Sequence, residues 1–140
     1  MDIKLNYLHL CDAATIDSFG KLSILGIFTK IYLLKVPSKF LKFTVVGNIS
    51  FDEITGEKYK FEIRIYDPNK VEVDVKQPIV MELSIPKDNK EKKRELNILL
   101  DLGNIEFKSF GYYKLVIFVN GTELGSRTFL VEERIVPKKT

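Results

Sequence analysis

The feature that most constrains the fold is a period-two alternation of apolar and polar residues. An extended strand points successive side chains to opposite faces, so this period is typical of strands with one buried and one exposed face. A turn around Asp17–Gly20 separates the first two predicted strands. The predicted strands are Leu5–Ala13, Leu22–Leu34, Leu41–Phe51, Tyr59–Ile65, Leu96–Leu102, Tyr113–Val119 and Leu124–Val131.

Turn chemistry marks where these strands end. Pro68 and its neighbours Asp67 and Asn69 predict a turn, and Asn120-Gly121 predicts a tight hairpin, because a type I′ turn needs positive φ twice. Proline cannot donate to a central ladder, so the short segments beside Pro78 and Pro86 are expected at sheet edges. These edge segments are Val71–Val75 and Ile79–Ile85. The charged stretch Lys87–Glu95 predicts a loop, and Lys87–Leu100 is the one place where a helical turn fits.

Together these signals predict an all-β chain, an antiparallel sandwich of about seven to nine strands. The chain has 140 residues, 45% of them hydrophobic, and shows no repeat or linker. This is typical of one globular domain over residues 1–140. Within it, residues 1–34 are expected to form the N-terminal strands and residues 132–140 a C-terminal tail.

The penultimate strand contains Gly111-Tyr112-Tyr113-Lys114-Leu115. Immunoglobulin-like domains carry Gly-x-Tyr-x-Cys at this point, and the Tyr hydroxyl bonds to upstream backbone in a tyrosine corner. Leu115 stands where the Cys would be, as expected of a version from a reducing compartment. The pattern therefore favours an immunoglobulin-like sandwich.

The chain also resembles an uncharacterised bacterial family of small β-sandwich proteins, known by a domain-of-unknown-function label. The turn at Asp67–Lys70 departs from the Asp-x-Gly type expected there. The resemblance implies an immunoglobulin-like fold and no established activity, so it supplies no functional residues. It rests on Leu10-Cys11-Asp12-Ala13-Ala14, the segment Gly20–Phe28, Phe110, Gly111 and Tyr113, and Asn120-Gly121.

Few residues offer catalytic or metal chemistry. One Cys and one His cannot form an intramolecular disulfide or a zinc site. His9 and Cys11 share a strand face about 7 Å apart, while Asp12 points the other way, so they form no triad. Asp67 and Asn69 are too few oxygen ligands for calcium. We expect no catalytic residue, cofactor or metal, and therefore no enzyme.

Charge and hydropathy argue against nucleic acid and membrane. The net charge is only +3. The aromatic Tyr59 and Phe61 fall on the opposite face from Lys60 and Arg64, so no basic stacking platform forms. No signal peptide is recognisable, and no apolar run approaches the ~20 residues that span a bilayer. A cytoplasmic protein with Cys11 as a free thiol is expected.

Some strands carry more apolar residues than one core uses. Tyr112, Val116 and Phe118 fall on the outward side of their strand, and Leu22–Leu34 is apolar on both sides, with Leu25 on the extra side. Such surfaces need a cover, which is either the N-terminal segment or another protein subunit.

We therefore predict a protein–protein interaction or structural module, with a protein partner or a homodimer. Its candidate surface is Tyr112, Val116 and Phe118. The alternative is a small-ligand or carbohydrate-binding sandwich that uses Tyr66 and loop residues.

Overall fold

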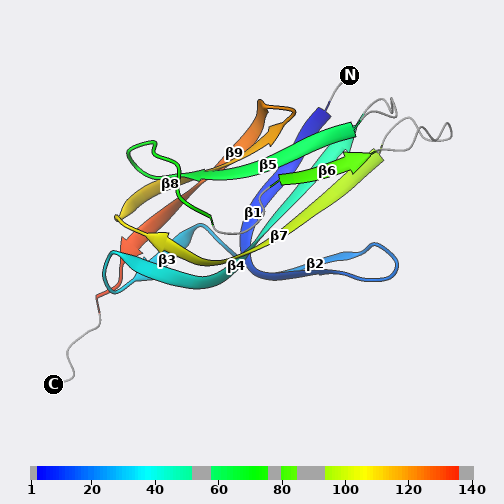
Figure 1. Cartoon of the computed structure of the whole chain (residues 1–140). Helices are drawn as coiled ribbons and strands as arrows, with labels where there is room; N and C mark the ends of the chain where they lie inside the picture. Colours follow the sequence, from blue (N-terminus) through cyan, green and yellow to red (C-terminus); the bar gives the residue numbers. More distant parts are fainter. Residues whose placement is uncertain (1–2, 52–57, 76–79, 85–93, 136–140) are drawn as a thin grey trace.

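The protein is described by a computed structural model that covers residues 3–51, 58–75, 80–84 and 94–135. Two mostly antiparallel sheets pack face to face (Figure 1). One sheet has the order β2-β1-β4-β7 and the other β3-β9-β8-β5-β6. The strands are β1 (Ile3–Ile16), β2 (Leu22–Phe28), β3 (Lys30–Leu33), β4 (Ser38–Phe51), β5 (Lys58–Tyr66), β6 (Val80–Ser84), β7 (Arg94–Phe107), β8 (Gly111–Val119) and β9 (Thr122–Glu133).

The alternation predicted from the sequence sets which side chains face the core. On β5, Phe61 and Ile63 are buried between the sheets, whereas Lys60 is exposed on the outer face. On β8, Leu115 and Ile117 are likewise in the core. Burying these apolar surfaces contributes about 25 cal/mol per Å² removed from water, which favours the register with apolar residues inward.

The strand order is that of an immunoglobulin-like sandwich. β1, β4 and β7 are neighbours in one sheet, and β5, β8 and β9 in the other, all antiparallel. β3 adds to the second sheet by pairing parallel with β9. No helix occurs in the ranges that the structure describes. The all-β prediction is confirmed.

The tyrosine corner predicted from Gly111–Leu115 is present. The Tyr113 hydroxyl donates a hydrogen bond of 2.8 Å to the backbone carbonyl of Ser109. Its ring packs against Phe107 and Phe129, with centroid separations of 5.1 and 5.6 Å. Leu115 is fully buried where a disulfide cysteine would stand in a secreted relative.

Two turns follow their predicted chemistry. Asn120 and Gly121 both have positive φ, 49° and 83°, as a type I′ hairpin requires. At the other turn, the Asp67 carboxylate accepts hydrogen bonds from the backbone N–H groups of Asn69 and Val71. These bonds satisfy backbone donors that the turn would otherwise leave open.

The prediction of one strand over Leu22–Leu34 is wrong. The chain forms β2 in one sheet, changes sheet at Thr29, and continues as β3 in the other. The Thr29 carbonyl accepts the Leu130 N–H at 2.9 Å, which joins the crossing point to β9. The change of sheet shifts the inward side chains from the even-numbered Leu22, Ile24 and Phe28 to the odd-numbered Ile31 and Leu33. It does not account for Leu25 and Ile27, which are exposed on the other side of β2.

One smaller prediction is also wrong. Val71–Val75 is not a strand. It pairs with β5 through an isolated bridge from Glu72 to Tyr66 and a bond from Val73 N–H to the Ile65 carbonyl, while Val71 bonds to Asp67 within the turn. A helical turn is absent over residues 94–100, which belong to β7, while residues 87–93 lie outside the described residues. β6 is at a sheet edge as predicted; Ile79 and Ile85 also lie outside the described residues.

Replacing Tyr113 by Phe is expected to lower the free energy of unfolding by about 1 to 2 kcal/mol, because the Ser109 carbonyl loses its donor near the core. Chemical denaturation measures this change. Tyr112→Phe is the matched control, since its side chain is exposed on the same strand. Equal stability of the two variants would contradict a stabilising tyrosine corner.

Candidate functional site

The surface predicted on β8 is only partly exposed. Tyr112, Val116 and Phe118 lie on the outer side of the strand, because the residues that alternate with this side belong to the core: Tyr113, Leu115, Ile117 and Val119. Tyr112 is 66% exposed, but Val116 is 1% exposed and Phe118 is half-buried. Val116 is on a central strand, directly opposite the longer Arg64 of β5. Its side chain is therefore not available to a partner.

Charged side chains occupy the neighbouring part of this face. Arg64 forms hydrogen-bonded ion pairs with Glu62, at 2.8 Å, and with Glu72. Lys60 approaches Glu62 at 3.2 Å. Hydrogen bonds from Arg64 and Lys60 hold the pKa of Glu62 below its ordinary value. Tyr66, the residue proposed for ligand binding, is half-buried at the end of β5 opposite Lys114.

A projecting hairpin is the most exposed apolar element of the described chain. Residues 12–28, which we call the arm, comprise the end of β1, a turn and β2. The arm extends away from the two packed sheets (Figure 1). Its turn is closed by the Asp17 carboxylate, which accepts hydrogen bonds from the N–H groups of Phe19 and Lys21 at 2.8 and 2.9 Å.

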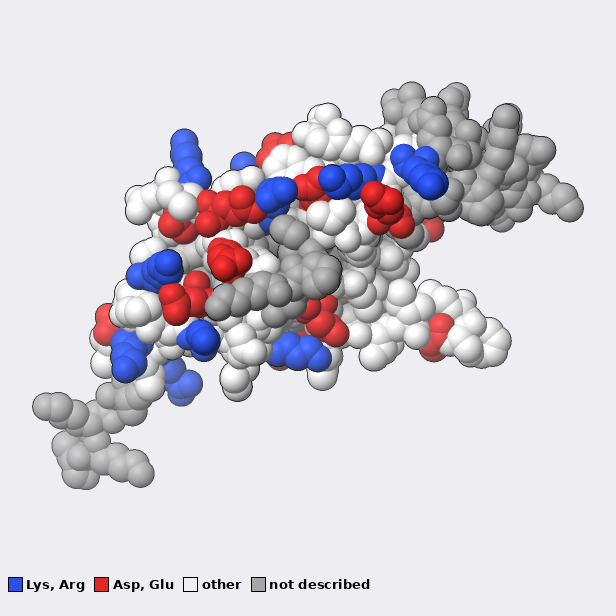
Figure 2. All heavy atoms as spheres, viewed as in Figure 1, with Lys and Arg blue, Asp and Glu red and all other residues white. Residues whose placement is uncertain are grey.

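Apolar side chains on the arm face solvent. Phe19 at the tip is 87% exposed, and Leu25 and Ile27 on the outer side of β2 are 70% and 52% exposed. Ile16 is also exposed, on the opposite face of the hairpin, because it pairs with Leu22 rather than with Leu25 or Ile27. In Figure 2 the arm is the largely white projection at the lower right, while red and blue groups alternate over the strands above it. Exposed apolar side chains that share one side of a strand, as Leu25 and Ile27 do, are typical of an interaction site.

The outer edge of β2 also has backbone donors and acceptors with no strand partner among the described residues. β2 is the last strand of its sheet and pairs only with β1 among the described residues. Its sequence, Leu22–Phe28, contains no charged residue and no proline. Natural edge strands are usually protected by charge, proline or a bulge. The other edge strands each carry charge: Lys30 on β3, Glu82 on β6, and Asp101 among others on β7.

The arm was only partly foreseen from the sequence. The sequence indicated Leu25 as part of an apolar surface that needs a cover, because Leu22–Leu34 is apolar on both sides. Phe19 was missed, since it lies in a turn where the alternation does not apply. A large aromatic residue between Ser18 and Gly20 is the signal that points to it.

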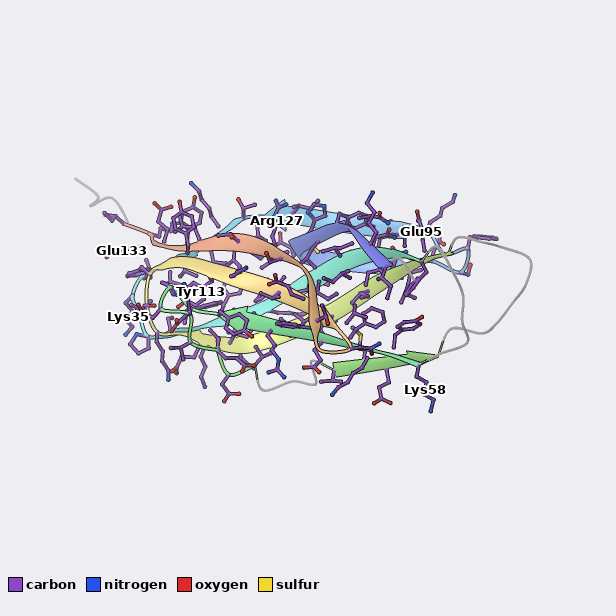
Figure 3. The ribbon with its side chains drawn as sticks, turned by 90° about the horizontal axis from the view of Figure 1, so that it is seen from above. Lys35, Lys58, Glu95, Tyr113, Arg127 and Glu133 are labelled. Atoms are coloured by element: carbon purple, nitrogen blue, oxygen red, sulfur yellow. The ribbon has the colours of Figure 1, made fainter. Side chains whose placement is uncertain are left out.

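His9 and Cys11 do not face each other as a nucleophile and base. The Cys11 thiol is fully buried and donates to the Thr44 carbonyl at 3.5 Å. The His9 ring stacks on Tyr7 with a centroid distance of 5.2 Å. Burial, and then the charge of Arg127, lower the pKa of His9. Arg127 lies on β9, on the side of the molecule where that strand runs beside β1 (Figure 3).

The residues that the structure describes contain no group of three His, Cys, Asp or Glu side chains placed to hold a metal ion. The Asp67 carboxylate is already engaged by its own turn. Within the same residues, no helix is both long and apolar enough to cross a membrane.

Comparison with known proteins places the chain in a family. The sequence pattern of one family of unknown function, DUF6941, matches residues 6–132. The chain belongs to this family. The resemblance inferred from Leu10–Ala14 and Phe110–Tyr113 is thereby confirmed. No curated protein matches the chain.

Two solved structures are similar to the chain at low sequence identity. An alkylpurine DNA glycosylase of Pseudomonas fluorescens, solved bound to DNA containing an abasic site analogue, matches with a TM-score of 0.50 and 11% identity. The match covers 93% of this chain, which spans only 30% of the glycosylase chain, so it bears on the fold alone. An immunoglobulin-like protein of Pseudomonas aeruginosa matches with a TM-score of 0.35 and 11% identity, covering 94% of this chain and 98% of the other.

The Cys11 thiol is expected to react with a thiol reagent only after unfolding, because it is inaccessible and burial raises its pKa above the ordinary 9.0. The folded state favours the protonated thiol over the thiolate. The stability that the Cys11 thiol contributes is therefore complete below pH 9.0 and is lost as the pH rises through the pKa of the folded state.

Labelling with Ellman's reagent across a urea titration measures the reactivity. The Cys11→Ala variant isolates the titration, because the stability difference from wild type should shrink above pH 9.0. Rapid labelling of the native protein would contradict the buried placement.

Proposed function

We propose that the chain is a non-enzymatic protein–protein interaction module that forms a homodimer through the β1–β2 arm. The observation that carries the proposal is the open, uncharged edge of β2 beside the exposed Leu25 and Ile27. A free strand edge offers backbone donors and acceptors, and adjacent apolar side chains add surface to bury.

Among the sheet edges of the described chain, the edge of β2 is the one that best fits a second copy of the chain. Two identical strands pair antiparallel across a two-fold axis, so the same patch serves both protomers. Pairing β2 with its copy brings no charged side chain of Leu22–Phe28 against another. The same operation on β7 would bring an acidic residue against its own copy if the axis passed at Asp101 or at Glu106. Like charges across strands are destabilising.

The surface first predicted on β8 supports an interface less well. Tyr112 is its only largely exposed member, with Lys114 next to it on the outer face. By contrast, the arm combines several exposed apolar side chains with an unpaired backbone edge. A reducing compartment, the cytoplasm, fits a chain with one buried free thiol and Leu115 in place of a disulfide cysteine.

Replacing both Leu25 and Ile27 by Asp is expected to convert the dimer to a monomer, because two charges would enter a pairing edge and remove its apolar surface. Sedimentation velocity and light scattering over a range of protein concentrations measure the mass. Thermal unfolding checks that the variant remains folded.

The matched control replaces Leu41 and Val71 by Asp. Both are exposed apolar residues outside the arm, so the control adds the same charge elsewhere. The control should keep the wild-type mass. The proposal fails if wild type is monomeric throughout, or if both double variants have the same mass as wild type.

A further inference from the structure

A second feature lies at the root of the arm. Asp12 follows Leu8 and Leu10 on the inner side of β1, but those two residues are buried in the core whereas Asp12 is exposed. A recess of about 250 Å³ opens there between the end of β2, the start of β3 and β4. It is lined by Asp12, Phe28, Lys30, Tyr32 and Phe40.

Aromatic rings form a fixed wall of this recess. Phe28 and Phe40 are half-buried and meet edge to face, with centroids 6.4 Å apart and planes at 61°. Both pack at 6.0 Å against Phe43, which is fully buried and belongs to the core. Contact with the buried Phe43 therefore fixes the positions of both rings in the absence of a ligand. Tyr32 adds a third ring that is 52% exposed.

Two opposite charges complete the lining. The Asp12 carboxylate makes no hydrogen bond or ion pair with another described residue. Gly26 leaves room for it, because a Cβ built there would lie 2.2 Å from Asp12 Oδ2. Gly26 also has a φ of 68°, which favours glycine. Lys30 is the only cation among the lining residues, so the formal charge of the recess is zero.

We propose that this recess binds a neutral saccharide, one pyranose ring at a time. The apolar face of a pyranose packs on aromatic rings, and its hydroxyl groups both donate and accept hydrogen bonds. They would donate to the Asp12 carboxylate and accept from the Lys30 ammonium. Neither a cation nor an anion is favoured by a lining of net charge zero, whereas a neutral polyol uses both groups.

Two other recesses of the described chain fit such a ligand less well. One has a volume of about 340 Å³, and no aromatic residue is among its lining residues Arg64, Glu72, Val73, Asp74 and Val75. The second has a volume of about 330 Å³ and is lined mainly by charged residues, including Glu72, Asp74 and Glu106. Its one aromatic residue, Tyr113, is buried and already hydrogen-bonded to Ser109. The recess at the root of the arm is therefore the better saccharide site.

Binding is tested by saturation-transfer NMR with the methyl glycosides of glucose, galactose, mannose and N-acetylglucosamine at millimolar concentration. We expect at least one of them to bind and to shift the backbone amide signals of Asp12, Phe28 and Tyr32. Replacing Tyr32 by Ala should weaken that binding about tenfold, because it removes an exposed ring from the site. Asp12→Asn should weaken it as well, by removing a charged acceptor.

Tyr112→Ala is the matched control, since it removes an exposed tyrosine that does not line the recess. Its affinity should equal that of wild type, and amide spectra verify that each variant is folded. The inference is overturned if no glycoside in the panel binds, or if the shifts fall elsewhere. Equal losses for Tyr32→Ala and Tyr112→Ala would overturn it too. The inference would also be overturned if phenylalanine, a zwitterion, binds to the recess and none of the glycosides does.

Discussion

The change of sheet at Thr29 is the constraint on which the rest of this structure depends. Phe28 ends a strand of one sheet, and Lys30 begins a strand of the other. Because β3 then pairs with β9, it completes the second sheet and leaves β2 as the edge of the first. The arm, its open edge and the recess at its root all follow from this one crossing.

The sequence predicted the parts of the fold that depend on local pattern. Alternation identified the core sides of β5 and β8, and Tyr113 and Asn120-Gly121 marked a corner and a hairpin through short-range chemistry. Leu22–Leu34 was ambiguous, because apolar residues on both sides describe either one doubly buried strand or two strands in different sheets. Only the long-range pairing with β9 separates these cases.

The candidate site was harder to predict for the same reason. Val116 has the outward orientation that the alternation indicates, yet it is buried on a central strand, between Arg64 of β5 and Ser126 of β9, and only strand pairing brings these residues beside it. Excess apolar character correctly drew attention to Leu25. The recess brings Asp12, Phe40 and the residues around Thr29 together from the four strands β1 to β4, which no spacing in the sequence encodes.

The most direct test of edge pairing is amide hydrogen exchange of β2 at increasing protein concentration. If β2 pairs with a second copy, alternate amides of Leu22–Phe28 should exchange more slowly as the concentration rises, because they gain a partner. The amides of β7, the other edge strand of the same sheet, provide an internal reference that should not change. Exchange in β2 that is independent of concentration, or a slowing that is equal in β7, would contradict pairing through the arm.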